Sequence, residues 1–468
     1  MVTLLLPEIS IFLLAVIFLF ISIKKNKSET SLSFAKFVSI IPFVISIFCV
    51  SGRGLLFSGA YSIDLFSQLF KVMLAFGFCV VVFMLENTDD IEREYVAEYF
   101  MFLAFSVLGL MMLVSSVELI SIVIALEVSS YSLYVVVPLR KGHSKMQWEA
   151  AIKYLFFGAI STGVMLYGMS FIYAACRSTF LADIVLTFPT LVGHPLGIVA
   201  LIMTLSGFFF KLSLFPFHFW APDIYEGASN VTTTFIATIP KIAGAALLIR
   251  FTMIAPSFYM QFVNILVILA ALSMTFGNIV GLVQKDVKRL LAYSGIAHAG
   301  YLLMGVLALT RDGNAAAVYY IAIYLLMNLA CLYVVVLLAN KGENVELDDL
   351  MGLSRRAPVL ALTLAVAAFS LAGIPPTGGF TGKLFLFTSA FKQGHLTLVI
   401  IGAVNTVISI FYYLNLVRMS YSKEAPPNNS NPIKLTFNQK MVCYVLVFMI
   451  LYMGILPKSI FGLFKAAL

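Results

Sequence analysis

Charge is what this 468-residue sequence has least of: only 11% of its residues are Asp, Glu, Lys or Arg, whereas 61% are hydrophobic. A soluble domain carries roughly a quarter charged residues. So few charges exclude a soluble globular protein of this length, and so much hydrophobicity excludes a disordered chain. The mean hydropathy of +1.01 predicts a polytopic, all-α membrane protein. The net charge of +8 then reports membrane topology rather than nucleic-acid binding.

Cysteines and nucleotide-binding motifs are also scarce. The five cysteines lie far apart, which excludes a disulfide-rich secreted domain and leaves no iron–sulfur or zinc spacing. Neither GxGxxG nor GxxxxGK[ST] occurs, and the five histidines show no metal-ligand spacing. We therefore expect no cofactor and no metal in this chain. The first hydrophobic run, 4–23, lacks the flanks of a signal peptide, so we expect a retained helix.

Long hydrophobic runs are plentiful, and a run of about 20 apolar residues can cross a bilayer as a helix. Fourteen stretches qualify: 4–23, 34–51, 63–85, 96–114, 117–138, 150–174, 196–215, 231–254, 258–283, 291–309, 315–339, 358–391, 396–417 and 440–461. The seventh runs into Pro216 and Pro222, and the twelfth is interrupted between Gly373 and Gly379. Proline removes a helical hydrogen bond, so both are predicted to be broken helices.

The distribution of basic residues predicts orientation. With the N-terminus outside, 18 of the 30 Lys and Arg fall on the cytoplasmic side, 7 fall on the external side and 5 lie within hydrophobic stretches. Because short cytoplasmic loops carry an excess of Lys and Arg, this bias predicts that both termini are external.

The two broken helices share a nine-residue pattern, GFFFKLSLF at 207–215 and GFTGKLFLF at 379–387. Six matches can arise by chance in a Phe- and Leu-rich chain, but both copies fall at the helix breaks. The copies are five helices apart, so the pattern predicts two inverted five-helix repeats, as transporters use. The predicted units are 1–95 (three N-terminal helices), 96–257 (helices 4–8), 258–420 (helices 9–13) and 421–468 (a loop and helix 14).

Ionisable residues within the hydrophobic stretches are the candidate functional residues, because they are costly in a membrane. They are Lys71, Lys153, Lys211, Lys241, Lys383 and Glu127. A lysine near a helix end can instead extend its amine to the interface, which is a strong alternative for Lys71. The alternative for the deeper residues is a static buried ion pair.

Proton movement is the chemistry that this set predicts. In a low-dielectric interior, a lysine and a glutamate both hold charge less readily, so each can exchange a proton near neutral pH. We expect a Glu127–Lys211 pair to keep the lysine charged until it releases its proton to Lys241. Lys383 would be the equivalent in the second repeat, and His298 would carry protons between the halves.

The remaining polar positions near the breaks have simpler expected roles. His218 flanks the first break and is expected to satisfy freed backbone groups. Tyr293, Ser294, Tyr324 and Asn328 can hold water between the lysines, or can join helices by hydrogen bonds.

Three segments closely resemble the subunit N family of bacterial-type respiratory complex I, the NADH–quinone oxidoreductase. They are FKLSLFPFHFWAPDIYEGASNVTTTFIATIPKIAG at 210–244, QKDVKRLLAYSGIAHAGYLLMG at 284–305 and SLAGIPPTGGFTGKLFLF at 370–387. WAPDIYEGA is similar to subunit N rather than to its sister subunits L and M. The resemblance implies proton-carrying roles for residues that match the family's motifs: Glu127, Lys153, Lys211, Lys241, His298 and Lys383.

The resemblance also implies partners and location. NADH, FMN, iron–sulfur clusters and quinone would be bound by other subunits, and the neighbours would be membrane-arm subunits such as M and K, together with lipids. The chain would be a multi-pass component of a hetero-oligomer in a bacterial inner membrane, translocating protons and binding no nucleic acid. Alternatives are a subunit of a multi-subunit cation/proton antiporter, a membrane-bound hydrogenase or a ferredoxin-using relative. A purely structural scaffold is disfavoured by the charges within the stretches.

Overall fold

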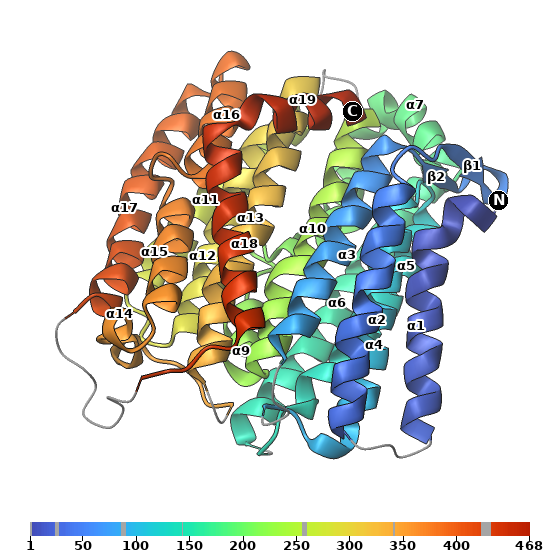
Figure 1. Cartoon of the computed structure of the whole chain (residues 1–468). Helices are drawn as coiled ribbons and strands as arrows, with labels where there is room; N and C mark the ends of the chain where they lie inside the picture. The colour runs from blue at the N-terminus through green and yellow to red at the C-terminus, as the bar shows by residue number, and fades with distance from the viewer. Residues whose placement is uncertain are drawn as a thin grey trace.

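The chain is a bundle of long helices in a computed structural model (Figure 1). The structure describes residues 2–23, 28–85, 90–142, 144–254, 260–339, 342–422 and 432–468. Both termini lie at the same end of the bundle, the upper end in Figure 1. The predicted boundary between the two repeats, at 257–258, and His143 lie outside the described residues.

The N-terminal part contains three long helices and one small hairpin. Its elements are η1 (Val2–Leu5), α1 (Leu6–Ile23), α2 (Ser28–Phe48), β1 (Gly54–Leu56), η2 (Phe57–Gly59), β2 (Tyr61–Ile63) and α3 (Leu65–Met84). The hairpin strands are antiparallel, with Gly54 opposite Ile63. Asp64 begins α3 with a capping box, since its side chain accepts from the Ser67 N–H and Ser67 returns a bond to the Asp64 N–H.

The next part contains the first broken helix. Its elements are η4 (Arg93–Tyr95), α4 (Val96–Ser115), α5 (Leu119–Val136), η5 (Val137–Leu139), α6 (Lys145–Cys176), α7 (Leu181–Val192), α8 (Pro195–Leu212), α9 (Trp220–Gly227) and α10 (Asn230–Ile254). As predicted, the seventh hydrophobic stretch is interrupted: α8 ends at Leu212, and Ser213 takes a left-handed conformation with φ 59°. The chain resumes helical structure only at Trp220.

The C-terminal half contains the second break. Its elements are α11 (Met260–Gly281), α12 (Val287–Val306), α13 (Arg311–Leu338), η6 (Leu347–Leu350), α14 (Leu353–Arg356), α15 (Pro358–Ala372), α16 (Gly378–Lys392), α17 (Leu396–Ser420), α18 (Phe437–Ile455) and α19 (Pro457–Ala467). The break falls where the sequence predicts it, between α15 and α16. Gly373 ends α15 at φ +84°, a conformation that an L side chain rarely adopts.

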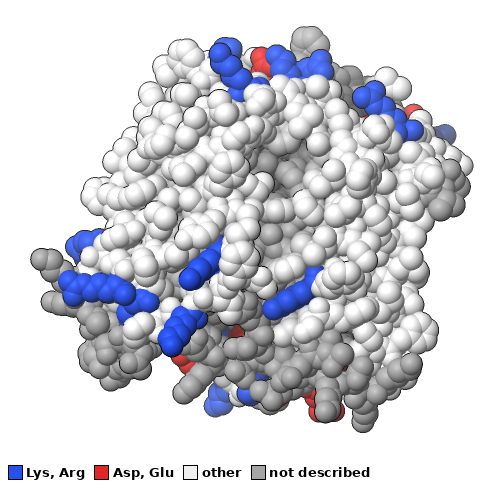
Figure 2. Space-filling model, viewed as in Figure 1, with Lys and Arg blue, Asp and Glu red and all other residues white. Residues whose placement is uncertain are grey.

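Eleven of the described helices are long and apolar enough to cross a membrane, so the chain is a multi-pass membrane protein. The most apolar 18 residues of α10 are entirely buried, whereas only a third of the corresponding residues of α6 are. In the face shown in Figure 2, Lys and Arg gather toward the two ends and leave a broad uncharged belt between them. Helix α10 is therefore the centre of the bundle, and α6 faces its surroundings.

Candidate functional site

The first helix break places Lys211 in the protein interior. Lys211 lies in the last turn of α8 and is 2% exposed. Its Nζ is 3.2 Å from the Ser130 Oγ and 3.4 Å from the Ser129 Oγ, both on α5. Ser129 continues the polar contacts to Ser106 on α4, at 3.0 Å. The buried amine is thus surrounded by hydroxyl groups.

Glu127 precedes these serines by two and three residues on α5, and its side chain contacts α6. The Thr162 hydroxyl donates to its Oε1 at 2.6 Å, and the residue is only half-buried. The direct Glu127–Lys211 pair of the sequence analysis is not among the ion pairs of the described residues. The two residues belong to one polar group in which serines, rather than the carboxylate, contact the amine.

Lys241 lies on the central helix α10 and has few polar contacts. Its Nζ is 3.4 Å from the Tyr324 hydroxyl and 5.7 Å from the ring centroids of Tyr225 and Tyr324. A small cavity of about 10 Å³ is lined by both Lys241 and His298. This volume is close to the minimum that one water molecule needs. The cavity depends on Gly295, where a Cβ would lie 2.7 Å from the amine.

His298 lies on α12 and contacts tyrosines of two other helices of the C-terminal half, α13 and α17. Its Nδ1 is 2.6 Å from the Tyr320 hydroxyl, and its Nε2 is 3.0 Å from the Tyr413 hydroxyl. Tyr413 in turn hydrogen-bonds to Ser294. A neutral imidazole has one donor and one acceptor nitrogen, so each hydroxyl can exchange hydrogen-bond roles with the ring when the tautomer changes.

Lys383 lies on α16, across the second helix break. Its Nζ donates to the carbonyl oxygens of Leu371 and Ala372, each at 3.0 Å. These carbonyls belong to the last turn of α15, where a helix leaves acceptors without partners. The amine also lies 4.7 Å from the ring centroid of Tyr301, one turn from His298 on α12. Lys383 therefore caps the broken helix and adjoins the histidine.

Lys153 lies apart from this group. Its side chain is 36% exposed and pairs with Glu149 and Asp223, each at 2.6 Å. Asp223 on α9 also binds Arg289 on α12 at 3.1 Å, so the three charged side chains connect α6, α9 and α12. The sequence predicts an intramembrane proton carrier here, and the structure places the residue in a partly exposed ionic network.

Two further residues differ from their expected surroundings. Lys71 does not extend to an interface, because it is fully buried and pairs with Glu8 at 2.6 Å. His218 does not satisfy freed backbone groups, because neither ring nitrogen has a hydrogen-bond partner. Its ring instead packs against Phe215 and Phe276, with centroid distances of 5.3 and 4.6 Å.

Sequence reasoning missed several polar neighbours of the candidate residues: Ser129, Ser130, Thr162, Tyr301, Tyr320 and Tyr413. The two serines carried a usable signal, because they follow Glu127 by two and three residues on one helix. Tyr413 carried none, because 115 residues separate it from His298. Among the described residues, no group of three His, Cys, Asp or Glu side chains has a metal-binding arrangement.

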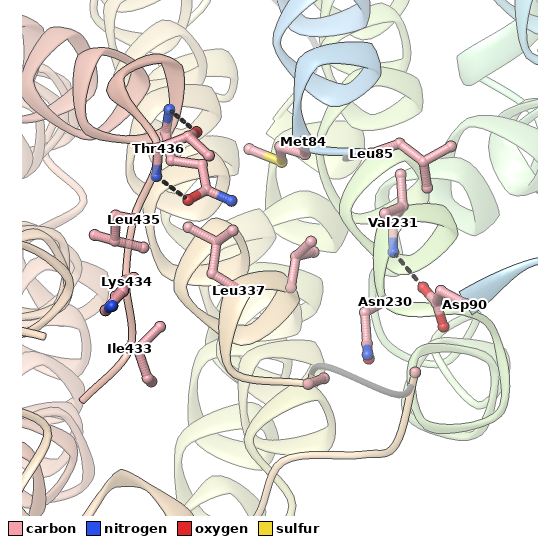
Figure 3. Close-up of a pocket in the computed structure, with 14 residues that line it drawn as sticks. Met84, Leu85, Asp90, Asn230, Val231, Leu337, Ile433, Lys434, Leu435 and Thr436 are labelled. Atoms are coloured by element: carbon pink, nitrogen blue, oxygen red, sulfur yellow. Dashed lines mark hydrogen bonds between the residues drawn. The ribbon is translucent and has the colours of Figure 1, made fainter. Parts of the chain in front are cut away.

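A larger cavity, of about 340 Å³, lies away from these lysines (Figure 3). It is bounded by the start of α10, the ends of α3 and α13, and the segment before α18. Asp90 and Lys434 are its charged residues, and Asp90 accepts the Val231 N–H at 3.3 Å. Asn230, at the start of α10, is eleven residues before Lys241, which is about 16 Å along the axis. The lysines are therefore not part of this cavity.

The sequence of this chain matches a known family and resembles individual proteins that carry the same subunit name. Residues 116–409 match the family described as NADH:quinone oxidoreductase/Mrp antiporter, transmembrane. NADH-quinone oxidoreductase subunit N 2 of Solidesulfovibrio magneticus is 44% identical, over 95% of this chain and 94% of that protein. The subunit N 2 of Opitutus terrae is also 44% identical, over 88% and 87%.

Solved structures share the fold. A chain of respiratory complex I from Thermus thermophilus superposes with a TM-score of 0.82 at 28% identity, covering 97% of this chain and 98% of that one. A chain of the Mrp complex from a Dietzia species superposes with a TM-score of 0.87 at 16% identity, covering 100% and 97%. The chain therefore belongs to the NADH:quinone oxidoreductase/Mrp antiporter transmembrane family, among relatives that are named NADH-quinone oxidoreductase subunit N.

Proposed function

We propose that this chain is a proton-translocating membrane-arm subunit of an NADH-quinone oxidoreductase. The observation that carries the proposal is the series of buried basic groups at and between the two helix breaks: Lys211, Lys241, His298 and Lys383. The sequence similarity to subunit N proteins over nearly the whole chain supports the assignment to this complex.

Proton transfer through this series uses groups that the chain itself supplies. Lys211 gives up a proton when the charge of Glu127 is drawn away, and Lys241 accepts it through the interior between α8 and α10. A water in the 10 Å³ cavity passes it to His298. Lys383 receives it through hydroxyl groups beside the histidine. Each transfer moves one proton between a protonated and a neutral basic group, so no group is oxidised or reduced.

The energy for this movement comes from elsewhere. Moving one charge across the membrane costs about 2.3 kcal/mol per 100 mV. The chain has no nucleotide motif, and we assign NADH, FMN, iron–sulfur clusters and quinone to partner subunits. Redox chemistry in those subunits would displace the charge of Glu127 and so start the transfer.

Neighbouring subunits would cover the surface around Glu127. This surface, the α5–α6 face, exposes Ile120, Ile124 and Tyr131 on α5, and Phe156 and Ile160 on α6. The half-buried carboxylate of Glu127 lies within it, and a carboxylate in contact with lipid is costly. A membrane-arm neighbour, such as the M or K subunit, would supply a polar partner there, while lipids cover the remaining apolar faces.

The proposal includes the number of membrane crossings, the orientation of the chain and the two repeats. The chain would cross a bacterial inner membrane fourteen times with both termini external. Helices α4–α10 and α11–α17 would form the two inverted repeats, with the described boundaries close to 96–257 and 258–420. Interruption of α8 and of α15–α16 at corresponding positions supports this symmetry.

An alternative is a subunit of a multi-subunit cation/proton antiporter, a membrane-bound hydrogenase or a ferredoxin-using relative. The Mrp complex and an archaeal membrane-bound sulfane sulfur reductase share the fold, with TM-scores of 0.87 and 0.85. Purification through an affinity tag on this chain distinguishes an NADH-quinone oxidoreductase from these alternative complexes. Copurification of NADH-binding and iron–sulfur subunits supports the first proposal, and recovery of membrane antiporter subunits alone contradicts it.

Proton pumping by the assembled complex tests the mechanism. Lys211→Ala and Glu127→Ala should each strongly lower proton pumping, because one removes the first proton donor and the other removes the charge that controls it. Lys392→Ala is the matched control, because Lys392 is an exposed lysine at the end of α16. Pumping and quinone reduction that are unchanged in both site variants would refute the assignment.

A further inference from the structure

Arg140 is a half-buried charged residue that the lysine series does not include. It comes directly after η5, which continues α5. Its Nη2 donates to the Gly342 carbonyl at 2.7 Å and to the Asn344 Oδ1 at 2.9 Å, both in the loop after α13. Its Nη1 donates at 3.1, 3.2 and 3.3 Å to three successive carbonyl oxygens at the end of α9, those of Glu226, Gly227 and Ala228. Arg140 therefore joins the ends of α5 and α9 to the loop after α13.

None of the five acceptors of Arg140 is a carboxylate. The ion pairs of the described residues do not include this arginine. Its guanidinium instead satisfies carbonyl groups that the end of a helix leaves without partners, and its charge complements the negative end of the helix dipole. Lys288 on α12 reinforces this end of α9, because its Nζ donates to the Ala228 carbonyl at 2.9 Å.

Helix α9 depends on contacts at its ends because it is short. It has eight residues, and isolated helices of fewer than about 12–15 residues are only marginally stable in water. At its beginning, the Trp220 indole Nε1 donates to the Phe210 carbonyl at 3.0 Å. Phe210 directly precedes Lys211 in the last turn of α8. Helix α9 thus extends from the Arg140 contacts to the helix break beside Lys211.

We infer that Arg140 is a positioning residue for Lys211. It holds the end of α9, and α9 holds the first helix break through the hydrogen bond from Trp220 to Phe210. Arg140 also follows α5, the helix whose serines contact the Lys211 amine. One guanidinium therefore fixes both the helix that carries the partners of the lysine and the short helix beyond the break. This inference rests on the proposed function, in which Lys211 is the first proton donor.

Hydrogen exchange of the assembled complex, followed by mass spectrometry, tests the connection from Arg140 to the break. Arg140→Lys keeps the charge, but a compact ammonium cannot reach both groups of acceptors as the planar guanidinium does. Two backbone amides report the result: Ala228, which ends α9, and Leu214, which lies in the break. The Ala228 amide should exchange roughly tenfold faster, the factor that corresponds to loss of one charge-assisted hydrogen bond. The Leu214 amide should exchange several-fold faster.

Two further variants accompany Arg140→Lys. Arg418→Lys is the matched control at an exposed arginine in the last turn of α17, and it should change neither amide. Asn344→Ala keeps Arg140 but removes one of its acceptors, together with the Asn344 Nδ2 that donates to the Glu226 carbonyl at 3.0 Å. It should therefore accelerate both amides, but less than Arg140→Lys does. It also supplies the test if Arg140→Lys does not assemble.

Trp220→Phe tests whether the effect passes through α9. This variant removes the indole donor but keeps an aromatic ring, so it should accelerate exchange at Leu214 several-fold and leave Ala228 unchanged. Adding Arg140→Lys to it should not accelerate Leu214 further, because the connection is already broken. Faster exchange at Ala228 without faster exchange at Leu214 in Arg140→Lys would overturn the inference, since Arg140 would then stabilise only the end of α9.

Proton pumping distinguishes failure of this inference from failure of the proposed function. Arg140→Lys should lower pumping several-fold in complex that assembles normally on native gels, whereas Arg418→Lys should not. Pumping that is lost in Lys211→Ala but normal in Arg140→Lys would overturn the inference and leave the proposed function intact. Pumping that is normal in both Lys211→Ala and Arg140→Lys would refute the proposed function, and with it the inference.

Discussion

Removal of the Lys383 amine should expose the end of a broken helix, whereas removal of the Lys241 amine should not. Lys383 donates to two carbonyl oxygens of α15, each at 3.0 Å. The Lys241 amine has one long contact, 3.4 Å to the Tyr324 hydroxyl. Both lysines are buried. The variants Lys383→Met and Lys241→Met therefore relieve a similar desolvation cost but leave different numbers of acceptors without partners.

The expected difference follows from those two acceptors. A buried acceptor without a partner costs about 1–3 kcal/mol. The local stability at the end of α15 should therefore be lower in Lys383→Met than in Lys241→Met by about 2–6 kcal/mol, twice that cost. Because 1.4 kcal/mol corresponds to a factor of ten, backbone amides there should exchange hydrogen roughly 30-fold faster or more.

Hydrogen exchange of the assembled complex, followed by mass spectrometry, measures this difference. The reporting amides are those of Gly373 and Ile374, which donate to the Phe369 carbonyl at 3.0 and 2.9 Å. Both variants should lower proton pumping, but only Lys383→Met should accelerate exchange at these amides. Equal exchange rates in the two variants would show that Lys383 does not cap the helix, and the reasoning would fail.

Three smaller predictions follow from single contacts. Gly295→Ala would bring a Cβ to 2.7 Å from the Lys241 amine, so native gels should show normal assembly while proton pumping falls. Burial raises the pKa of Asp64, but Arg250 and the Ser67 hydrogen bonds together lower it below its usual value, so the thermal midpoint of wild type should exceed that of Asp64→Asn at neutral pH. That difference should shrink below about pH 4, where the carboxylate is protonated. Lys153→Ala should change stability by about 1 kcal/mol or less, since its ion pairs are partly exposed.

The position of a buried charge along the chain was predictable, but its contacts were not. Lys211 and Lys383 stand out because each adjoins a helix break that local Pro and Gly residues predict. Lys153 also lies in a hydrophobic stretch, yet its side chain is partly exposed and pairs with Asp223, 70 residues later in the chain. Sequence distance to a helix end does not report which charged groups a neighbouring helix brings there.

The Glu8–Lys71 ion pair is a second contact that the sequence did not predict. From its sequence position, Lys71 was expected to be able to reach an interface, and α1 carries no sign that Glu8 would meet it. Packing of α1 against α4 and of β2 beside α3 encloses both residues and Tyr61. An isolated ionisable residue in a hydrophobic stretch therefore indicates that the residue has a specific structural or functional role. Which partner it contacts is decided by helix packing.

The sequence by itself determined the membrane class, the helix breaks and the family, because hydropathy, Pro and Gly positions and motifs are local properties of the chain. Only the tertiary structure decided that serines contact Lys211, that tyrosines from distant helices contact His298, and that Lys383 caps α15. These contacts join residues as far as 115 positions apart. They arise when helices pack together and each buried polar group must find a partner in its new surroundings.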